Sequence, residues 1–264
     1  MKNFLDEIYC AYNKREFVNP DPLQFLYDYK DIRDREIVGL IASSLAYGRV
    51  AQIIKSVANV LYRMGGAPRD FVTFSSDNSV KKALAGFKHR FTTGSEISNM
   101  LVAVKHAIDE HGSLNKCFVD GYDASSPTVL PALSNFVGEL SGGRQWAKGL
   151  LPSPEMGSAC KRLNLYLRWM VRKDSVDPGG WKGVLPSALV VPLDTHMYKV
   201  GRAFKFTKRK AADIKTALEI TKAFAVLSPQ DPIKYDFALT RFGIRDGAGM
   251  KDEHKALANL WQIR

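Results

Sequence analysis

The chain has 264 residues, 45% of them hydrophobic and 25% charged, and its 38 Lys/Arg against 27 Asp/Glu give a net charge of +11. These proportions are typical of a globular protein and exclude collagen-like, low-complexity and wholly disordered chains. No run of about 18 apolar residues is present, so we expect no membrane span. The first ten residues, MKNFLDEIYC, carry acids where an export signal needs an apolar stretch, and the three widely spaced cysteines predict free thiols in a reduced cytoplasm.

The positive charge is concentrated after the N-terminal segment. Residues 1–37 hold six Lys/Arg and eight Asp/Glu, whereas Lys161 to Lys173 has five basic residues and Lys199 to Lys210 has six, neither stretch with an acid. Clustering of this kind is typical of a site for a polyanion, most often nucleic acid, although a solvated basic face gives the same pattern.

The hydrophobic spacing is helical almost throughout and predicts an all-α fold of roughly eight to twelve helices. Residues from about 35 to 63 predict two helices with a break at Tyr47-Gly48-Arg49. Thr93 and Glu96 form a capping box that opens the next helix, and Gly112 ends it. No segment convincingly predicts a strand.

Later in the chain, a helix around Leu133 to Leu140 ends at Ser141-Gly142-Gly143. Residues 161–172 are apolar on most sides and predict a buried central helix, in which we interpret Trp169 as a core residue. After a loop rich in proline and glycine, the remaining predicted helices cover about 194–204, opened by Asp194; 211–227; 231–243, opened by Asp231 and Pro232; and 252–262.

Several common motifs are absent from the sequence. There is no GxxxxGK[ST], GxGxxG, GxSxG or HExxH, which disfavours a nucleotide-binding loop, a serine hydrolase elbow and a zinc protease site. His106 and His111 are five residues apart and so lie on different helix faces, and we expect no metal and no other cofactor. His89 and His254 are interpreted as surface residues.

Two segments carry candidate chemistry. The first places Lys161 at the start of a mostly apolar helix. Partial burial disfavours the charged form of a lysine, and a neutral lysine amine is a nucleophile for Schiff-base chemistry. The second places Asp194 at a helix N-terminus, where backbone N–H groups orient a carboxylate. A lysine and a fixed carboxylate facing one cleft would suit attack on a sugar carbon of DNA.

The second segment, PLDTHMYKVGRAF, resembles the VDTHV-x-R segment of helix-hairpin-helix DNA glycosylases, in which the aspartate is catalytic. The lysine segment lacks the usual LPGVG-x-K hairpin and is more similar to the archaeal 8-oxoguanine glycosylase branch, whose lysine opens an aromatic-rich helix. Asp194 follows Lys161 by 33 residues, after a proline-containing loop, as in that branch. Residues 38–72 resemble the early glycosylase helix pair, and residues 40–245 are similar to a family of predicted cytosolic bacterial proteins whose name implies no function.

The resemblance implies a two-lobed, helix-hairpin-helix glycosylase-like fold. Residues 38–160 would form a middle helical lobe, and residues 1–37 with 161–264 would form a second, with the active cleft between them. The implied activity is that of a bifunctional DNA glycosylase and AP lyase in base excision repair, with 8-oxoguanine as the first candidate base. Lys161 would attack the anomeric carbon of a flipped nucleotide, and Asp194 would accept a proton or stabilise oxocarbenium character.

Other residues are expected to line the base pocket or bind DNA. The glutamine typical of the early helix turn is absent, and Tyr47 and Arg49 stand there instead. Asp236 lies where related enzymes draw base-pocket residues from a C-terminal helix. The remaining candidates are Arg162, Arg168, His196 and Arg202.

The implied partner is double-stranded DNA with a damaged base, and the implied location is the cytoplasm, associated with the nucleoid. We expect a monomer that needs neither metal nor membrane. Two alternatives remain: a nucleic-acid-binding protein of the same fold without catalysis, which the missing glutamine and irregular hairpin favour, and an enzyme acting on RNA. Salt-dependent binding would fit all three, so only an assay of catalysis separates them.

Overall fold

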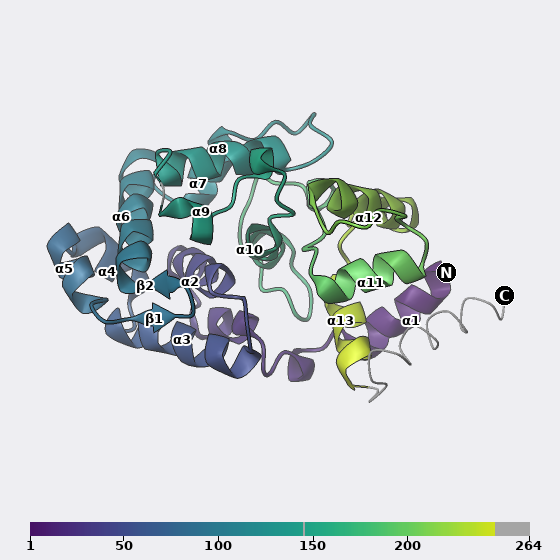
Figure 1. Ribbon diagram of the computed structural model, residues 1–264, viewed down its shortest axis with the longest axis horizontal. Coiled ribbons are helices and arrows are strands. Elements are labelled where there is room, and N and C mark those ends of the chain that lie inside the picture. The colour runs from purple at the N-terminus through teal and green to yellow at the C-terminus, as the bar shows by residue number, and fades with distance from the viewer. Residues whose placement is uncertain (145, 246–264) are drawn as a thin grey trace.

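Helices form nearly all of the ordered framework in the computed structural model, which describes residues 1–144 and 146–245. These residues contain thirteen α-helices, four short 3₁₀ helices and one two-stranded antiparallel sheet (Figure 1). The all-α class is therefore confirmed, with more helices than expected. None of the described helices combines the length and apolarity that crossing a bilayer requires.

Along the chain, one set of elements precedes residue 151 and a second set follows it. The first comprises α1 (Lys2–Tyr12), η1 (Arg15–Phe17), η2 (Pro22–Asp28), α2 (Ile32–Ser44), α3 (Val50–Arg63), α4 (Pro68–Phe74), α5 (Asp77–Ala83), β1 (Lys88–His89), β2 (Thr92–Thr93), α6 (Gly94–His111), α7 (Leu114–Asp120), α8 (Leu130–Ser141) and α9 (Ala147–Leu150). The second comprises η3 (Pro154–Met156), α10 (Lys161–Val171), η4 (Pro186–Ala188), α11 (Thr195–Ala203), α12 (Ile214–Leu227) and α13 (Asp236–Arg245).

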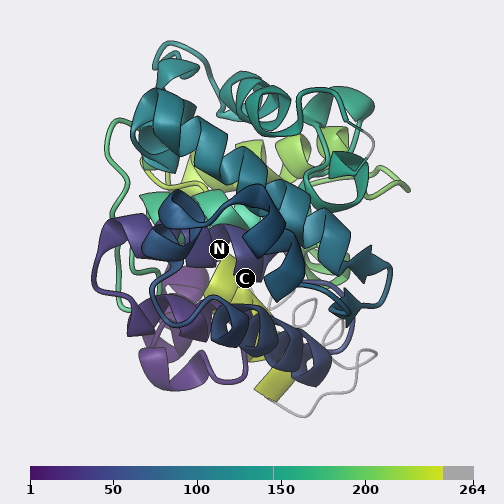
Figure 2. The same cartoon turned by 90° about the vertical axis from the view of Figure 1, so that its left-hand side faces the viewer.

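Helix α10 lies in the middle of the molecule, as its apolar sequence predicts (Figure 1). It packs along α2, where Gly39 leaves room for two side chains of α10: an added Cβ would lie 3.2 Å from Met170 Sδ and from Tyr166 Cε2. Helices α3 and α6 lie in front of this core when the fold is viewed from the side (Figure 2). On the other side, α1 packs against α13, so the two ends of the described chain meet.

Local capping explains several helix ends that the sequence predicts. At the start of α6, Thr93 N donates to Glu96 Oε2 over 2.7 Å and Glu96 N donates to Thr93 Oγ1 over 3.4 Å. Gly112 ends the helix with a φ of 85°, a conformation that glycine adopts at no steric cost. The break between α2 and α3 at Tyr47-Gly48-Arg49 is also confirmed.

Three local predictions were wrong. The helix expected from Asp231 begins at Asp236: residues 232–235 form a turn, and both carboxylate oxygens of Asp231 accept from Arg172 Nε over 3.0 Å. A short hairpin, β1 paired with β2, was not expected; two residues per strand give no alternating pattern to detect. His89 is buried rather than exposed, since its Nδ1 bonds to Ser56 Oγ over 2.8 Å. The helix expected over 252–262, and His254, lie outside the described residues.

Candidate active site

Lys161 and Asp194, distant in sequence, lie beside each other in space. Asp194 is the N-cap of α11: its Oδ1 accepts from Met197 N over 2.8 Å, which fixes the carboxylate. Its second oxygen, Oδ2, lies 3.9 Å from Lys161 Nζ. The two side chains keep 36% and 32% of their surface exposed, so the pair is open to a ligand from solvent.

The turn before α10 places the lysine. Gly157 and Cys160 have φ angles of 76° and 47°, and the latter lies in a region that non-glycine residues seldom occupy. Cys160 N donates to Ser158 Oγ over 3.2 Å, and Cys160 Sγ lies 3.1 Å from Pro152 O. Burial raises the pKa of the Cys160 thiol to about 11, so this thiol remains protonated at neutral pH and is not a nucleophile.

The lysine and aspartate border a pocket with a volume of about 120 Å³. Elements from both ends of the chain contribute to it: the start of η2, the α2–α3 connection and α3, α10, the segment before α11, and α13. The lining residues are Asp21, Pro22, Ala46, Ile53, Lys161, Leu165, Arg168, Trp169, Pro192, Asp194, Asp236, Phe237 and Thr240. Four candidate residues, Lys161, Arg168, Asp194 and Asp236, are thus brought together.

Arg168 and Asp236 are buried and paired with each other. Arg168 Nε also donates to Asp177 Oδ1 over 3.1 Å, which ties α10 to the loop that follows it. Burial raises the pKa of Asp236, against the opposing effect of the positive charge on Arg168. An arginine held in this way cannot reach a phosphate at the surface, so its place in the site is the pocket wall.

Two of the five basic residues from Lys161 to Lys173, Arg168 and Arg172, are buried, so only part of this stretch contributes to the surface charge that the sequence suggests. Arg172 is also buried: its guanidinium binds Asp174 over 2.8 Å, Asp231 over 3.0 Å and Asp177. Helical periodicity places Arg168 and Arg172 on the same inward face, four residues apart, where carboxylates from the following loop meet them.

Tyr47 and Arg162 border a second hollow, next to the pocket. The two are adjacent because Ala46 and Lys161 line the pocket, whereas their chain neighbours Tyr47 and Arg162 line the hollow. Arg162 Nη1 donates to Ser44 O over 2.8 Å, and its guanidinium lies 5.2 Å from the centre of the Tyr47 ring. The hydroxyl of Tyr47 donates to His89 O over 2.9 Å. Phe91, in the hairpin turn, borders the same hollow and is 83% exposed.

The remaining candidates lie outside both hollows. Arg49 is exposed at the N-cap of α3. His196 lies behind Asp194, with its Nε2 3.1 Å from Leu239 O of α13. Arg202 is exposed in the last turn of α11, and the rest of that basic stretch keeps three exposed lysines, Lys205, Lys208 and Lys210.

Among the pocket residues whose side chains can form hydrogen bonds, sequence reasoning missed three: Asp21, Trp169 and Thr240. Trp169 follows Lys161 by eight residues, and this helical spacing could have placed both on one face. Thr240 similarly follows Asp236 by four. No sequence signal indicated Asp21, because a contact between η2 and α13 joins residues far apart in the chain: Asp21 Oδ2 accepts from Arg241 Nη2 over 2.5 Å.

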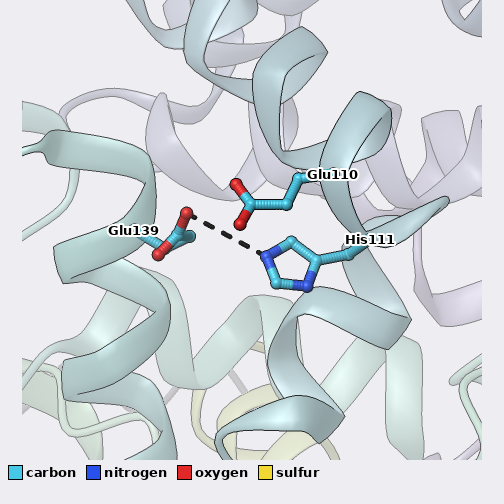
Figure 3. Close-up of side chains that lie close together, drawn as sticks. All are labelled: Glu110, His111 and Glu139. Carbon is cyan, nitrogen blue, oxygen red and sulfur yellow. Dashed lines mark ion pairs between the residues drawn. The ribbon is translucent and has the colours of Figure 1, made fainter.

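A separate cluster could hold a cation, and it lies outside the pocket. Ligand atoms of Glu110, His111 and Glu139 all lie within 4.8 Å of one another (Figure 3). His111 Nδ1 bonds to Asp120 Oδ2 over 2.9 Å, and its Nε2 lies 4.0 Å from Glu139 Oε1.

Residues 21–245 match the model of a family described as a protein of unknown function, DUF2400. The chain belongs to this family. The match extends from Asp21, the N-cap of η2, to the end of α13, so it includes every pocket residue. Neither a curated protein nor a solved structure matches the chain.

Proposed function

We propose that this DUF2400 protein is a DNA glycosylase and AP lyase that excises an oxidised base, with 8-oxoguanine as the first candidate. The observation that carries the proposal is the 3.9 Å separation of Lys161 Nζ and Asp194 Oδ2 at the mouth of a pocket. An amine nucleophile and an oriented carboxylate beside a concave site are the groups that lysine-dependent removal of a base requires. The PLDTHM segment, which resembles that of helix-hairpin-helix glycosylases, supplies the carboxylate.

The reaction assigns one task to each group. The target nucleotide leaves the base stack, and its base enters the pocket. Lys161 Nζ, as the free amine, attacks C1′; the glycosidic bond breaks, and the base leaves with the bonding electrons and takes up a proton. Asp194 accepts the proton that the attacking nitrogen loses. Opening of the sugar ring forms an imine at C1′, and loss of a C2′ proton then expels the 3′ phosphate by β-elimination, which cuts the strand.

Exposed basic side chains at the start of α3 and around the end of α11 support a polyanionic substrate. Arg49 lies at the start of α3, and Arg202 with the lysines after α11 lies beyond Asp194. Contacts from such side chains to phosphates position a duplex without reading its sequence. The exposed ring of Phe91 offers an apolar group that could occupy the space a flipped base leaves.

Borohydride trapping tests the proposal directly. The protein is incubated with a duplex that carries one 8-oxoguanine, and with a second that carries an abasic site, in the presence of borohydride. Reduction of the imine gives a stable covalent adduct. We expect an adduct with the wild-type protein and none with Lys161→Gln. Asp194→Asn should slow its formation by about 10²–10⁴-fold, the usual contribution of a positioned acid or base.

Lys173→Gln is the matched control, because Lys173 is an exposed lysine of the same basic stretch and does not line the pocket. It should form the adduct at the wild-type rate. Absence of an adduct on both duplexes would refute the proposal and favour a protein that binds nucleic acid without catalysis. Equal trapping by Lys161→Gln would refute the assignment of the nucleophile.

A further inference from the structure

A groove lies between α3 and the segment that leads into β1, and we call it the α3 groove. Its volume is about 430 Å³. One wall is a single face of α3, since the lining residues from Gln52 to Arg63 recur at spacings of three and four, and residues 86–88 form the other wall. Figure 1 shows β1 beside α3. The groove begins next to the pocket, because Gln52 lines the groove and its neighbour Ile53 lines the pocket.

Hydrogen bonds hold the two walls of the α3 groove together at both ends. Towards the pocket, Ser56 Oγ bonds to Nδ1 of the buried His89 over 2.8 Å. At the far end, Arg63 Nη1 donates to Ala83 O and to Ala85 O, each over 2.9 Å. A groove braced in this way is formed before a ligand arrives, so binding requires little ordering of the protein.

The α3 groove is basic. Lys55 and Lys88 are exposed on opposite walls, and none of the described residues that line the groove carries a carboxylate. The sequence around it has the same bias, because residues 50–63 and 85–93 contain no Asp or Glu. Tyr62, at the far end of the groove, is 86% exposed. Two lysines without an acid beside them to neutralise their charge attract a polyanion, and the net charge of +11 on the chain strengthens that attraction.

We propose that the α3 groove binds the phosphate backbone of duplex DNA on one side of the nucleotide that enters the pocket. The inference rests on the proposed function, which brings that nucleotide to Lys161. From Gln52 to Arg63, α3 rises by about 16 Å, and a DNA strand carries one phosphate per ~3.4 Å of the helix axis, so the groove spans about four nucleotides. The strand that enters the pocket continues beyond it, and the groove begins one residue of α3 away. An acidic peptide would match the charge of the groove, but nothing would bring it to this position.

The salt dependence of binding tests the proposal. Fluorescence anisotropy measures Kd over a series of salt concentrations for a duplex that carries tetrahydrofuran, a stable abasic analogue. In the double variant Lys55→Gln/Lys88→Gln, the slope of log Kd against log salt should fall by about two, because each phosphate contact contributes about 0.9. Lys215→Gln/Lys222→Gln is the matched control: it removes the same charge from exposed positions of α12 and should keep the wild-type slope. An unchanged slope in the groove variant, or no binding of the duplex by the wild type, would overturn the inference.

Shortened duplexes test whether the groove contacts only one side of the target nucleotide. Base pairs are removed from one side of the analogue or from the other. The groove variant should be less sensitive than the wild type to removal on one side and equally sensitive on the other. Wild-type sensitivity to both truncations would refute the assignment. Tighter binding of an RNA duplex of the same sequence, weakened equally in the groove variant, would assign the groove to RNA instead.

Borohydride trapping at saturating protein keeps this inference separate from the proposed function. Neither Lys55 nor Lys88 lines the pocket, so the groove variant should trap an abasic duplex at the wild-type rate once all of the duplex is bound. If the wild type binds the duplex but traps nothing, the glycosylase function is refuted, while the salt slope still decides whether the groove binds DNA. If the wild type traps and the groove variant keeps the wild-type slope, only the groove assignment is refuted.

A second measurement uses the wild-type chain and so does not depend on how a variant folds. Exposed lysine amines are acetylated with and without saturating duplex, and mass spectrometry reads the modification at each site. Bound duplex should protect Lys55 and Lys88 and leave Lys215 and Lys222 reactive. Equal acetylation of Lys55 and Lys88 in the presence and absence of duplex would overturn the inference.

Discussion

Replacement of Arg172 by methionine should be among the most destabilising single changes in the protein. Its buried guanidinium contacts three carboxylates, those of Asp174, Asp177 and Asp231, and so joins α10 to the loop after it and to the segment before α13. Methionine fills similar space without charge and leaves these carboxylates buried without their shared cation. Loss of one partner from a buried ion pair costs about 3–5 kcal/mol, and we expect about 4 kcal/mol here.

For a chain of this length, about 2–4 °C of Tm corresponds to each kcal/mol, so the midpoint should fall by roughly 8–16 °C. Differential scanning calorimetry and urea unfolding at pH 7.5 measure the change. Arg33→Met is the matched control: the Arg33 side chain is 61% exposed and pairs with one exposed aspartate, so the variant should keep the wild-type midpoint.

The pH dependence gives a second check on the same reasoning. Burial raises the pKa of Asp177 to about 6 and also raises the pKa of Asp231. The folded state therefore holds protons on these carboxyls at pH values where the unfolded chain has lost them, and the stability that depends on those protons is lost as pH rises. Without Arg172 the effect should grow, so the variant should lose less stability at pH 5 than at pH 7.5. A loss below about 1 kcal/mol at pH 7.5, or one that grows on acidification, would refute the reasoning.

Two further predictions concern the elements around Asp194. Gly201→Ala should destabilise the protein by about 1–3 kcal/mol in thermal or urea unfolding, because the added Cβ would lie 2.4 Å from Ile220 Cδ1 between α11 and α12. The control is Gly138→Ala on the exposed face of α8, where an added Cβ has nothing within 4 Å; it should stabilise the protein by about 0.5–1 kcal/mol. A more stable Gly201→Ala than Gly138→Ala would contradict the packing argument. Arg202→Gln should weaken binding of undamaged duplex and reduce the slope of log Kd against log salt by about one in a fluorescence titration, whereas an unchanged slope would remove Arg202 from the DNA-binding surface.

Much of the site was predictable because its determinants are local. A capping aspartate bonds to an N–H three residues away, so Asp194 could be assigned to a helix start from its neighbours alone, and the hydrogen bond to Met197 N confirms it. The capping box at Thr93 and the glycine end at Gly112 follow from the same short-range chemistry. The spacing of apolar residues likewise predicted α10 as a central helix.

The roles of the charged residues were decided only by tertiary structure. Arg168 and Arg172 look in sequence like a basic patch, and Asp231 looks like a helix cap. A buried charge without a partner is costly, so each buried arginine is paired with carboxylates. Arg168 pairs with Asp177 and Asp236, and Arg172 pairs with Asp231; these aspartates lie in the loop after α10 or far along the chain.

The pocket itself also depends on contacts between distant segments. Asp21 and Arg241 are 220 residues apart and yet hold η2 against α13, beside the lysine of α10. Sequence patterns predict only hydrogen bonds and helix faces that involve residues close together in the chain. They therefore indicated Lys161 and Asp194 separately, each from its own helix start. Which side chains share a cavity with them followed only from how the helices pack.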